Sequence, residues 1–349
     1  MMKSEEIAKL AGVSRSTVSR VINNYTNVPE ETREKVMKII EQYGYEPNTS
    51  ARVLAGKGTN TIGLFVVSIA DKGNPNRIYQ NNYFAPFVDA VVDTANALGY
   101  YVLIHTVYSR EDYLKVKQAF LQKRVDSGII IGTEKDTVTV MDIAQKGYPI
   151  AIIDYDMDEI TRTNLNNSNL ILINSMDYEG TIMAMNYLIQ LGHREIGIIT
   201  GRLNTYSGRQ RYSAYEYVLR EHGININKNY ILRGDFLKRK AYQETKKLIQ
   251  SGRLPTAIFV CNDDMALSAM DALKEEGIRI PEDISIVGFD DVPVVSQLKP
   301  ALTTVKVPVY EMAKKAVEEL IQGTDEGSMK FSSFSFPTLL IERETVKKF

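Results

Sequence analysis

The chain has 349 residues and a formal net charge of −1, so its overall charge does not indicate a nucleic-acid or membrane partner. Its single cysteine, Cys261, excludes a disulfide framework within the chain and fits a reducing cytoplasm. The first ten residues lack the apolar core of a signal peptide, and no apolar run is long enough to span a bilayer. We therefore expect a cytoplasmic protein with one small and one large domain.

Three short helices are predicted at the start of the chain. Ser4 can cap a helix with an acidic first turn, and Gly12 tolerates the positive φ of a tight turn after it. Ser14 can cap a second helix, Arg15–Asn23, which has an apolar stripe along one face. A third helix from about Glu30 to Tyr43 completes a core that is too small for an independent enzyme.

The other face of the second helix is polar. Its N-terminal end is the part that a helix-turn-helix points at base edges in the major groove. We predict a helix-turn-helix DNA-binding domain over residues 1–47, in which the DNA-contacting side chains of this helix are Arg15, Ser16, Thr17, Ser19, Arg20 and Asn23.

Residues 48–60 are predicted to form a hinge helix and linker. A helix this short is marginal in water, so we expect it to become ordered when DNA binds it. The first 60 residues hold nine basic against seven acidic side chains, so phosphate affinity must come from their placement and from doubling in a dimer. The DNA-contacting side chains expected in the hinge are Ser50, Arg52, Leu54 and Lys57.

Beyond the hinge, short β-rich runs alternate with helical patterns, which indicates parallel sheets with crossover helices. Strands are predicted at Thr61–Val67, Tyr101–Thr106, Gly128–Ile131, Pro149–Asp154, Leu170–Asn174, Glu195–Thr200, Ala257–Val260 and Ile284–Phe289. Helices include Phe84–Leu98, Asp177–Leu191, Arg209–His222, Met265–Glu276 and Pro308–Ile321. Two sheets are favoured over an eight-stranded closed barrel, because the stretch Tyr155–Ser168 interrupts the alternation.

Nothing in the sequence indicates an enzyme. The three histidines are far apart with no metal-ligand spacing, and GKGT at 56–59 lacks the Walker pattern. Cys261 ends a predicted strand, where a small core residue is more plausible than a nucleophile. We expect no catalytic residues, no cofactor and no metal.

Several motifs in order resemble the lactose-repressor (LacI/GalR) family of bacterial transcriptional regulators. They are AKLAGVSRSTVSRVINN, VPEETREKVMKII, YGYEPNTSAR and GTNTIGLFV, followed by DYEGTIMAMNYLIQLGHREIGIITG, PTAIFVCNDDMALSAMDAL, IPEDISIVGFDD and LTTVKVP. The resemblance covers essentially the whole chain. Two departures are visible: Pro29 stands where the family usually has a capping serine, and the stretch from Asp71 to Asn82 is longer than usual.

The resemblance implies a two-lobed α/β body over residues 61–349 that is similar to a type I periplasmic sugar-binding protein, with two parallel sheets and flanking helices. Lobe 1 is expected at about 61–158 and 292–325, and lobe 2 at about 159–291 and 326–349. The chain should cross between the lobes near 155–165, 290–293 and 323–330.

Ligands of such bodies bind in the cleft at the carboxyl ends of the strands. The polar side chains expected there are Asp154, Arg211, Asn262 and Asp290, which together can grip vicinal hydroxyls. Family positions imply aromatic walls at Tyr83, Phe84, Tyr155 and Phe236. For several of these residues a structural role stays open, such as a helix N-cap for Asn262, a turn cap for Asp290 and core packing for Tyr83 and Phe84.

Thr205 and Ser207 are also placed at the cleft by the resemblance, and both are neutral where a purine-responsive relative is expected to have an arginine. The sequence therefore favours a homodimeric repressor of carbohydrate genes that binds a pseudo-palindromic DNA operator and a sugar-like effector. The alternatives are a purine or a phosphocarrier protein as effector. A sugar-binding transport receptor is the alternative from another class, but it leaves residues 4–56 unexplained.

Overall fold

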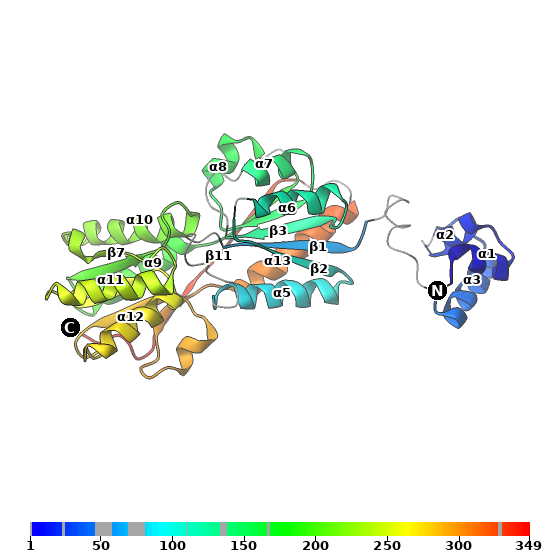
Figure 1. The fold of residues 1–349 in the computed structure, drawn as a ribbon. Coiled ribbons are helices and arrows are strands. Elements are labelled where there is room, and N and C mark those ends of the chain that lie inside the picture. The colour runs from blue at the N-terminus through cyan, green and yellow to red at the C-terminus, as the bar shows by residue number, and fades with distance from the viewer. Residues whose placement is uncertain are drawn as a thin grey trace. The chain divides into compact units, whose positions relative to one another are not determined.

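A computed structural model describes residues 2–22, 25–45, 58–68, 81–109, 111–132, 138–165, 168–326 and 330–349. The chain divides into two compact units, Met1–Thr59 and Asn60–Phe349 (Figure 1). Among the described residues, no helix is both long and apolar enough to cross a membrane.

The first unit consists of α1 (Ser4–Ala11), α2 (Arg15–Ile22) and α3 (Glu30–Tyr43). A small apolar core joins the three helices and includes Ile7, Val18, Val21 and Val36. Gly12 has the predicted positive φ of 65°, and the Ser14 hydroxyl accepts a hydrogen bond from the Thr17 N–H at 3.1 Å, as expected of a cap. The cap predicted for α1 is one residue off, because Lys3 has the extended backbone of an N-cap and Ser4 is already helical.

Lobe 1 of the second unit is built on a sheet of six parallel strands in the order β11-β5-β4-β3-β1-β2. The strands are β1 (Thr61–Val67), β2 (Tyr101–Val107), β3 (Ser127–Ile131), β4 (Ile150–Ile153), β5 (Leu170–Ser175) and β11 (Ser332–Phe336). Helices α5 (Phe84–Ala97) and α13 (Val309–Glu326) cover one face, and α6 (Asp112–Leu121) and α7 (Val138–Gln145) cover the other (Figure 1). A short helix, α8 (Met157–Arg162), follows β4.

Lobe 2 has its own six-stranded sheet in the order β12-β10-β9-β8-β6-β7, in which only β12 runs antiparallel to its neighbour. Its strands are β6 (Ile196–Thr200), β7 (Ile231–Arg233), β8 (Ala257–Val260), β9 (Ser285–Asp290), β10 (Thr303–Lys306) and β12 (Leu339–Ile341). Its helices are α9 (Asp177–Gln190), α10 (Tyr206–Glu221), α11 (Lys238–Gln250) and α12 (Asp263–Glu275), with 3₁₀ turns at Lys228–Tyr230 and Pro293–Gln297. The two open sheets confirm the predicted fold class, and the closed barrel is wrong.

The chain passes between the lobes at three places, after β5, after β10 and after β11. All three crossings predicted from the sequence lie too early. Leu170–Ser175 is buried along its whole length and pairs with β4, so it belongs to lobe 1. Thr303–Lys306 pairs with β9 in lobe 2, and Ser332–Phe336 returns to pair with β5. Apart from β12, the strands of each sheet run the same way, so their carboxyl ends gather at one edge of each lobe.

Candidate functional site

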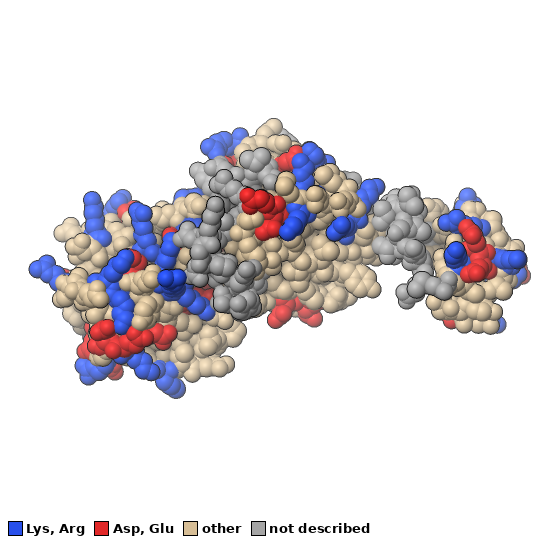
Figure 2. All heavy atoms as spheres, in the orientation of Figure 1, with Lys and Arg blue, Asp and Glu red and all other residues tan. Residues whose placement is uncertain are grey.

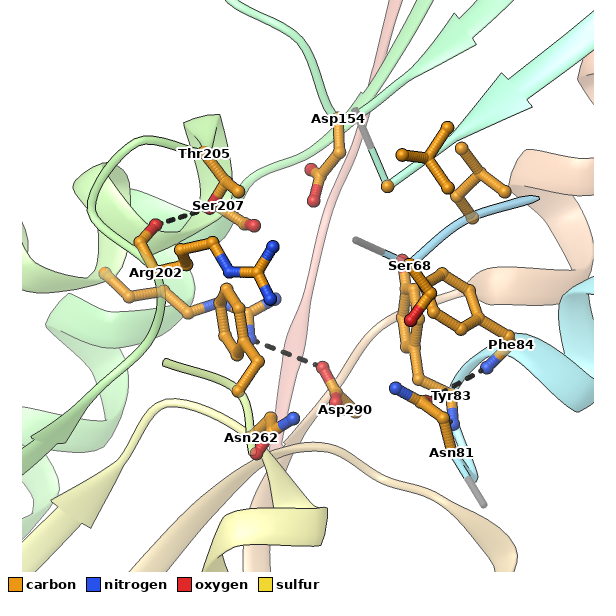
Figure 3. Close-up of a pocket in the computed structure, with 15 residues that line it drawn as sticks. Ser68, Asn81, Tyr83, Phe84, Asp154, Arg202, Thr205, Ser207, Asn262 and Asp290 are labelled. Atoms are coloured by element: carbon orange, nitrogen blue, oxygen red, sulfur yellow. Dashed lines mark hydrogen bonds and ion pairs between the residues drawn. The ribbon is translucent and has the colours of Figure 1, made fainter. Parts of the chain in front are cut away.

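A cavity of about 100 Å³ is lined by residues from both lobes, most of them at or just beyond the carboxyl ends of strands (Figure 3). Lobe 1 contributes Val67, Ser68, Asn81, Tyr83, Phe84, Ile131, Gly132 and Asp154. Lobe 2 contributes Arg202, Thr205, Ser207, Arg211, Phe236, Asn262 and Asp290.

Nine of the ten side chains expected at the cleft line this cavity, and Tyr155 does not. Tyr155 is only 4% exposed and packs in the lobe 1 core between the sheet and its outer helices. Its N–H donates to Asn174 Oδ1 at 2.9 Å and its carbonyl accepts from Asn174 Nδ2 at 2.8 Å. These bonds hold the backbone so that Asp154 faces the cavity and the next side chain enters the core.

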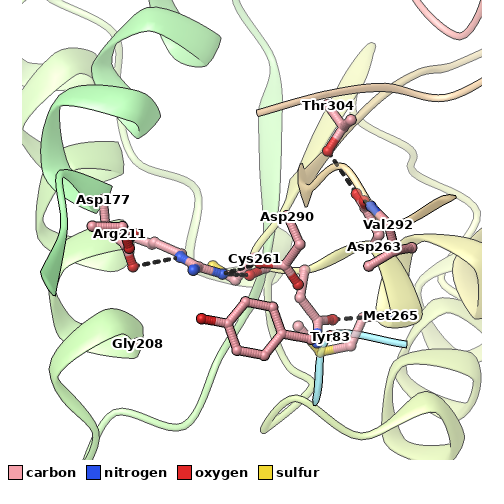
Figure 4. Close-up of polar contacts among 12 residues, drawn as sticks. Tyr83, Asp177, Gly208, Arg211, Cys261, Asp263, Met265, Asp290, Val292 and Thr304 are labelled. Carbon is pink, nitrogen blue, oxygen red and sulfur yellow. Dashed lines mark hydrogen bonds and ion pairs between the residues drawn. The ribbon is translucent and has the colours of Figure 1, made fainter. Parts of the chain in front are cut away.

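Arg211 is the cationic centre of the cavity wall. Its Nε donates to Asp177 Oδ2 at 2.9 Å, and its Nη1 donates to the Cys261 carbonyl and lies 3.4 Å from Asp290 Oδ1 (Figure 4). The guanidinium carbon lies 3.7 Å from the centre of the Phe289 ring, so the charge contacts the ring face in a cation–π interaction. Burial alone would lower the pKa of Arg211, but Asp177 and Asp290 raise it above its usual value.

Asp154 directly follows β4 and has a φ of +66°, a conformation that non-glycine residues rarely adopt. Its carboxylate points into the cavity (Figure 3), where the Oδ1 atom is buried and accepts no hydrogen bond from the described residues. Burial and the nearby carboxylate of Asp177 raise the pKa of Asp154 to about 7, against the lowering effect of Arg211. A buried oxygen without a donor is costly, so Asp154 is suited to accept a hydrogen bond from a ligand.

Asp290 ends β9 in a turn with unusual backbone angles, since Asp290 has a φ of 117° and Asp291 a φ of 60°. Buried Asp263 holds this turn by accepting hydrogen bonds from the Val292 N–H at 2.9 Å and from the Thr304 hydroxyl at 2.6 Å (Figure 4). Burial raises the pKa of Asp290 well above its usual value although Arg211 lowers it. The hydrogen bonds of Asp263 therefore hold Asp290 at the cavity in spite of the strained backbone.

Aromatic side chains from both lobes form a wall of the cavity. Tyr83 and Phe84 meet edge to face with ring centres 5.7 Å apart, on the lobe 1 side (Figure 3). On the lobe 2 side, Phe236 lies in a loop with a positive φ of 59° and packs over Gly201, where a Cβ would overlap its ring. Gly201 therefore makes room for Phe236. Flat rings on both sides suit a ring-shaped ligand.

Two polar residues of the cavity also cap helices, and a third bonds the backbone of the turn before a helix. Asn262 Oδ1 accepts from the Met265 N–H at 2.9 Å at the start of α12, and Thr205 Oγ1 accepts from the Gly208 N–H at 3.2 Å at the start of α10. Asn81 Oδ1 accepts from the Tyr83 N–H at 2.9 Å just before α5. The structural role left open for Asn262 is thus present, and it does not exclude a ligand contact, because the same residue lines the cavity.

The predicted DNA-reading side chains of α2 lie on its outer side. Arg15, Ser16, Ser19 and Arg20 are exposed, and Thr17 is half-buried. Arg15 Nη1 contacts Glu5 at 3.3 Å, but both side chains are about two-thirds exposed, so this pair is weak and free to exchange for a base or phosphate. Lys/Arg and Asp/Glu are interspersed on the visible face of this unit (Figure 2). Five predicted contacts lie outside the described residues: Asn23, Ser50, Arg52, Leu54 and Lys57.

Comparisons with known proteins give a family match in each of the two units. The family described as "Bacterial regulatory proteins, lacI family" matches residues 5–48, and a "Periplasmic binding protein-like domain" matches residues 185–346. "Probable HTH-type transcriptional repressor ExuR" of Bacillus subtilis (strain 168) is 33% identical over 350 residues, which is 100% of this chain and 99% of that relative. The chain belongs to the LacI family.

Other LacI-family relatives are similar over the same length. "HTH-type transcriptional repressor PurR" of Haemophilus influenzae (strain ATCC 51907 / DSM 11121 / KW20 / Rd) is 33% identical, covering 99% of each chain. A lac repressor dimer solved with operator and the anti-inducer ONPF has a TM-score of 0.80 at 30% identity, with 99% of each chain covered. A complex of the regulator CelR with cellobiose has a TM-score of 0.73 at 25% identity, covering 99% of this chain and 100% of CelR.

Membership of the LacI family makes this chain a DNA-binding transcriptional repressor and not an enzyme. Two potentially reactive side chains, Cys261 and His193, have structural roles. Burial raises the pKa of Cys261 to about 12, so its thiol stays protonated and unreactive. His193 is buried, with Nδ1 bonded to the Thr256 hydroxyl at 2.9 Å and Nε2 to the Lys347 carbonyl at 3.1 Å. Within the described ranges, no group of three or more potential ligands is placed to hold a metal.

Six cavity residues of this LacI-family chain were missed by sequence reasoning: Val67, Ser68, Asn81, Ile131, Gly132 and Arg202. For most of these residues, the position in the sequence could have indicated a place in the cavity. Ser68 and Gly132 directly follow buried strands, so they lie at the same sheet edge as Asp154, which itself follows β4. Arg202 lies in the loop between β6 and α10, and Asn81 is a cap type that stands just before a predicted helix.

Proposed function

We propose that this LacI-family repressor binds a small sugar or sugar derivative between its lobes and controls carbohydrate-utilisation genes in response. The observation that supports this best is the Asp154 carboxylate, whose buried Oδ1 lacks a donor in a cavity that also holds the Arg211–Asp290 pair. Carboxylates and a fixed guanidinium on opposite walls bind neighbouring hydroxyls in bidentate fashion. Aromatic rings on both sides provide the flat contacts that a sugar ring prefers.

The size of the cavity supports a small ligand. Its volume is about 100 Å³. A monosaccharide or a single purine base is of that order. The size therefore fits a small ligand and does not separate sugar from purine.

A purine effector is the second candidate, because PurR is among the relatives at 33% identity. The ring of Phe236 could stack on a base as well as on a sugar. We favour the sugar because Thr205 and Ser207 are neutral, and because a sugar hydroxyl can donate to the buried Oδ1 of Asp154, which lacks a donor.

A thermal-shift screen of the full chain tests the effector class. Neutral sugars, sugar acids, sugar phosphates, purine bases and a phosphocarrier protein are screened separately, since a ligand that binds only the native state raises its stability by mass action. We expect a sugar to raise the melting temperature of the wild type and not of Asp154→Asn. The matched control is Asp142→Asn, which changes a carboxylate paired with Lys117 and Lys146 on lobe 1 and outside the cavity. A response to purines alone would reverse the assignment.

For DNA, we propose that Arg15 and Ser16 read base edges, together with Thr17, Ser19, Arg20 and Asn23. A lost bidentate base contact costs about 1–3 kcal/mol and changes sequence preference. Arg15→Ala and Ser16→Ala should therefore alter the preferred operator in a binding selection. Lys57→Ala should instead weaken all sequences alike, as loss of a phosphate contact does. Uniform weakening by all three variants would refute the base-reading assignment.

In the hinge, we propose that Leu54 from each subunit of a homodimer wedges into the centre of a pseudo-palindromic operator, with Ser50 and Arg52 contacting DNA beside it. A wedged apolar side chain unstacks a base step and kinks the duplex. Leu54→Ala should lose both specific affinity and bending in a circular-permutation gel assay. Retained bending would contradict the proposal.

We propose that a second copy of the chain covers the outer edge of lobe 1 in a homodimer. The similarity to the lac repressor dimer supports a second copy as the partner. Strand β2 ends the sheet there, with Tyr101 74% and Ile104 47% exposed. Large exposed apolar side chains on an edge strand invite a partner. Ile104→Lys should yield monomers in light scattering, and a dimer that persists in this variant would place the interface elsewhere.

A further inference from the structure

The two lobes are joined by hydrogen bonds at the rim of the cavity. Asn82, just before α5 in lobe 1, donates from its backbone N–H to Asp264 Oδ2 at 3.2 Å and from Nδ2 to Asp264 Oδ1 at 2.6 Å. Asp264 lies in the first turn of α12 in lobe 2 and is only 4% exposed. The buried carboxylate of Asp264 in lobe 2 therefore accepts hydrogen bonds from the backbone N–H and from the side-chain amide of Asn82 in lobe 1.

The Asp264 carboxylate has a third donor in its own lobe. Lys238 Nζ, at the start of α11, lies 3.1 Å from Asp264 Oδ1. This ion pair holds the carboxylate in place whether or not lobe 1 is near. Bonds from Asn82 to a charged, buried acceptor are stronger than bonds between neutral groups, and opening the lobes would break both at once.

A separate contact joins the lobes elsewhere. Asp156, which caps α8 of lobe 1, accepts from Arg209 Nη2 of α10 at 2.7 Å. Asp156 follows the cavity residue Asp154 by two positions, and Arg209 follows Ser207 by two positions. The side chains of this ion pair are each about 30% exposed, so it is the more solvated of the two contacts.

The position of Asn82 in the chain gives the first contact its significance. Asn81 caps the backbone ahead of α5 and lines the cavity, while Tyr83 and Phe84 form its aromatic wall. Asn82 lies between Asn81 and Tyr83. It is the last residue of the stretch that is longer than usual for the family. Whatever fixes Asn82 against lobe 2 also fixes the wall.

We propose that Asn82 and Asp264 are positioning residues that form a latch: they hold the lobes closed and set the aromatic wall without contacting the effector. The name latch refers to this pair alone. That the wall serves an effector rests on the function proposed above, but closure of the lobes by the latch does not.

Hydrogen–deuterium exchange on the full chain, read by mass spectrometry without any ligand, tests the latch. Asn82→Ala and Asp264→Ala should each speed exchange at least tenfold in two places, the peptide holding Asn82–Phe84 and the remote peptide holding Arg202–Arg209. The second peptide lies in another part of lobe 2, from the loop after β6 into the start of α10, so its response reports opening of the lobes. Faster exchange at Asn82–Phe84 alone would mean a local bond and overturn the proposal.

Two variants guard against trivial explanations. Asp264→Asn keeps one oxygen acceptor and can accept one of the two bonds from Asn82, so exchange in the remote peptide should fall between the rates of the wild type and of Asp264→Ala. Lys246→Ala breaks ion pairs with Glu275 and Glu276 inside lobe 2, so it should leave both rim peptides unchanged. If Asp264→Ala simply unfolds, exchange will rise throughout lobe 2, and Asn82→Ala, which lies in a turn, still decides the question. Because no effector is added, an error in the proposed effector cannot change the result.

Discussion

At the scale of single residues, Arg211 shows how closely binding and stability are linked in this cavity. Its guanidinium is 4% exposed and neutralises the buried carboxylates of Asp177 and Asp290. Removing one member of a buried ion network typically costs about 3–5 kcal/mol, because the remaining charges are left uncompensated. We expect Arg211→Ala to lower the free energy of unfolding by that amount in urea titration.

The matched control for that measurement is Arg253→Ala, which removes an exposed arginine from the loop after α11. It should change stability by less than about 0.5 kcal/mol. Equal effects of the two variants would show that the network around Arg211 is unimportant for folding. A large loss also means that Arg211→Ala cannot isolate a ligand contact, so Asp154→Asn is the better probe of the cavity.

Asp154 should also make stability depend on pH. An aspartate titrates near 3.9 in an unfolded chain, whereas burial and Asp177 raise the pKa of Asp154 to about 7 in the fold. Between these values the folded chain keeps a proton that the unfolded chain has released. The stabilisation is therefore complete below about pH 4, falls as pH rises and is lost above about pH 7.

The measurement is the melting temperature of the wild type and of Asp154→Asn between pH 5 and pH 8. The melting temperature of the wild type should fall over this range more steeply than that of the variant, which cannot release the proton. Asp263, whose pKa burial also raises to about 7, leaves a residual slope in both proteins. Parallel slopes would show that Asp154 is ionised throughout.

Most residues of the site could be predicted because the ends of buried strands can be located in the sequence. Asp154, Asn262 and Asp290 each stand directly after or at the end of a buried apolar run, and such positions converge at one sheet edge. Tyr155 was misplaced because the backbone around Asp154 turns through a positive φ, which a sequence does not display. That the Oδ1 atom of Asp154 lacks a donor depends on long-range packing, so it needed the structure.

At the scale of elements, α10 starts in close contact with the loop that precedes it. A Cβ at Gly208 would overlap the carbonyl oxygen of Arg202, which is also bonded to the Thr205 hydroxyl at 2.6 Å. Because the obstacle is backbone, it cannot move aside without displacing the loop that carries Thr205 to the cavity. Tight contact here explains a glycine in a helix, where it is intrinsically unfavourable by about 1 kcal/mol relative to alanine.

Gly208→Ala should therefore destabilise the chain in spite of the better helix propensity of alanine. We expect a loss of about 1–3 kcal/mol, as for other forced overpacking, measured by urea unfolding. The control is Ser213→Ala in the exposed part of the same helix, which should be neutral or slightly stabilising. A stabilised Gly208→Ala would show that the loop yields easily and does not position Thr205.

Element types were easier to predict than the partners of each element. Thr61–Val67 and Ala257–Val260 were predicted to the residue, because a strand buried on both faces is a continuous apolar run bounded by polar residues. The predictions failed for β5, β10 and β11, which were placed in the wrong lobes. Pairing of a strand with one sheet or the other leaves no mark in its own residues, since both sheets offer the same apolar environment.

At the scale of the whole molecule, effector and operator binding should be coupled through the two units. Coupling between two binding sites is reciprocal, so the factor by which effector changes operator affinity equals the factor by which operator changes effector affinity, typically about 5- to 150-fold. Once the screen provides an effector, calorimetric titration into free protein and into protein saturated with operator measures it. Equal effector affinities in the two titrations would mean that the DNA-binding unit and the two-lobed unit are only tethered.

The three crossings between the lobes have a consequence for synthesis on the ribosome. The edge of β5 stays without its neighbour until β11 emerges, 157 residues after Ser175. At about 5–20 residues per second this takes roughly 8–30 s, during which an apolar strand edge is open to wrong partners. The helix-turn-helix has emerged long before. Nascent chains halted before Ser332 should therefore protect α1–α3 from protease but leave lobe 1 cleavable, and a lobe already protected at that point would refute this order.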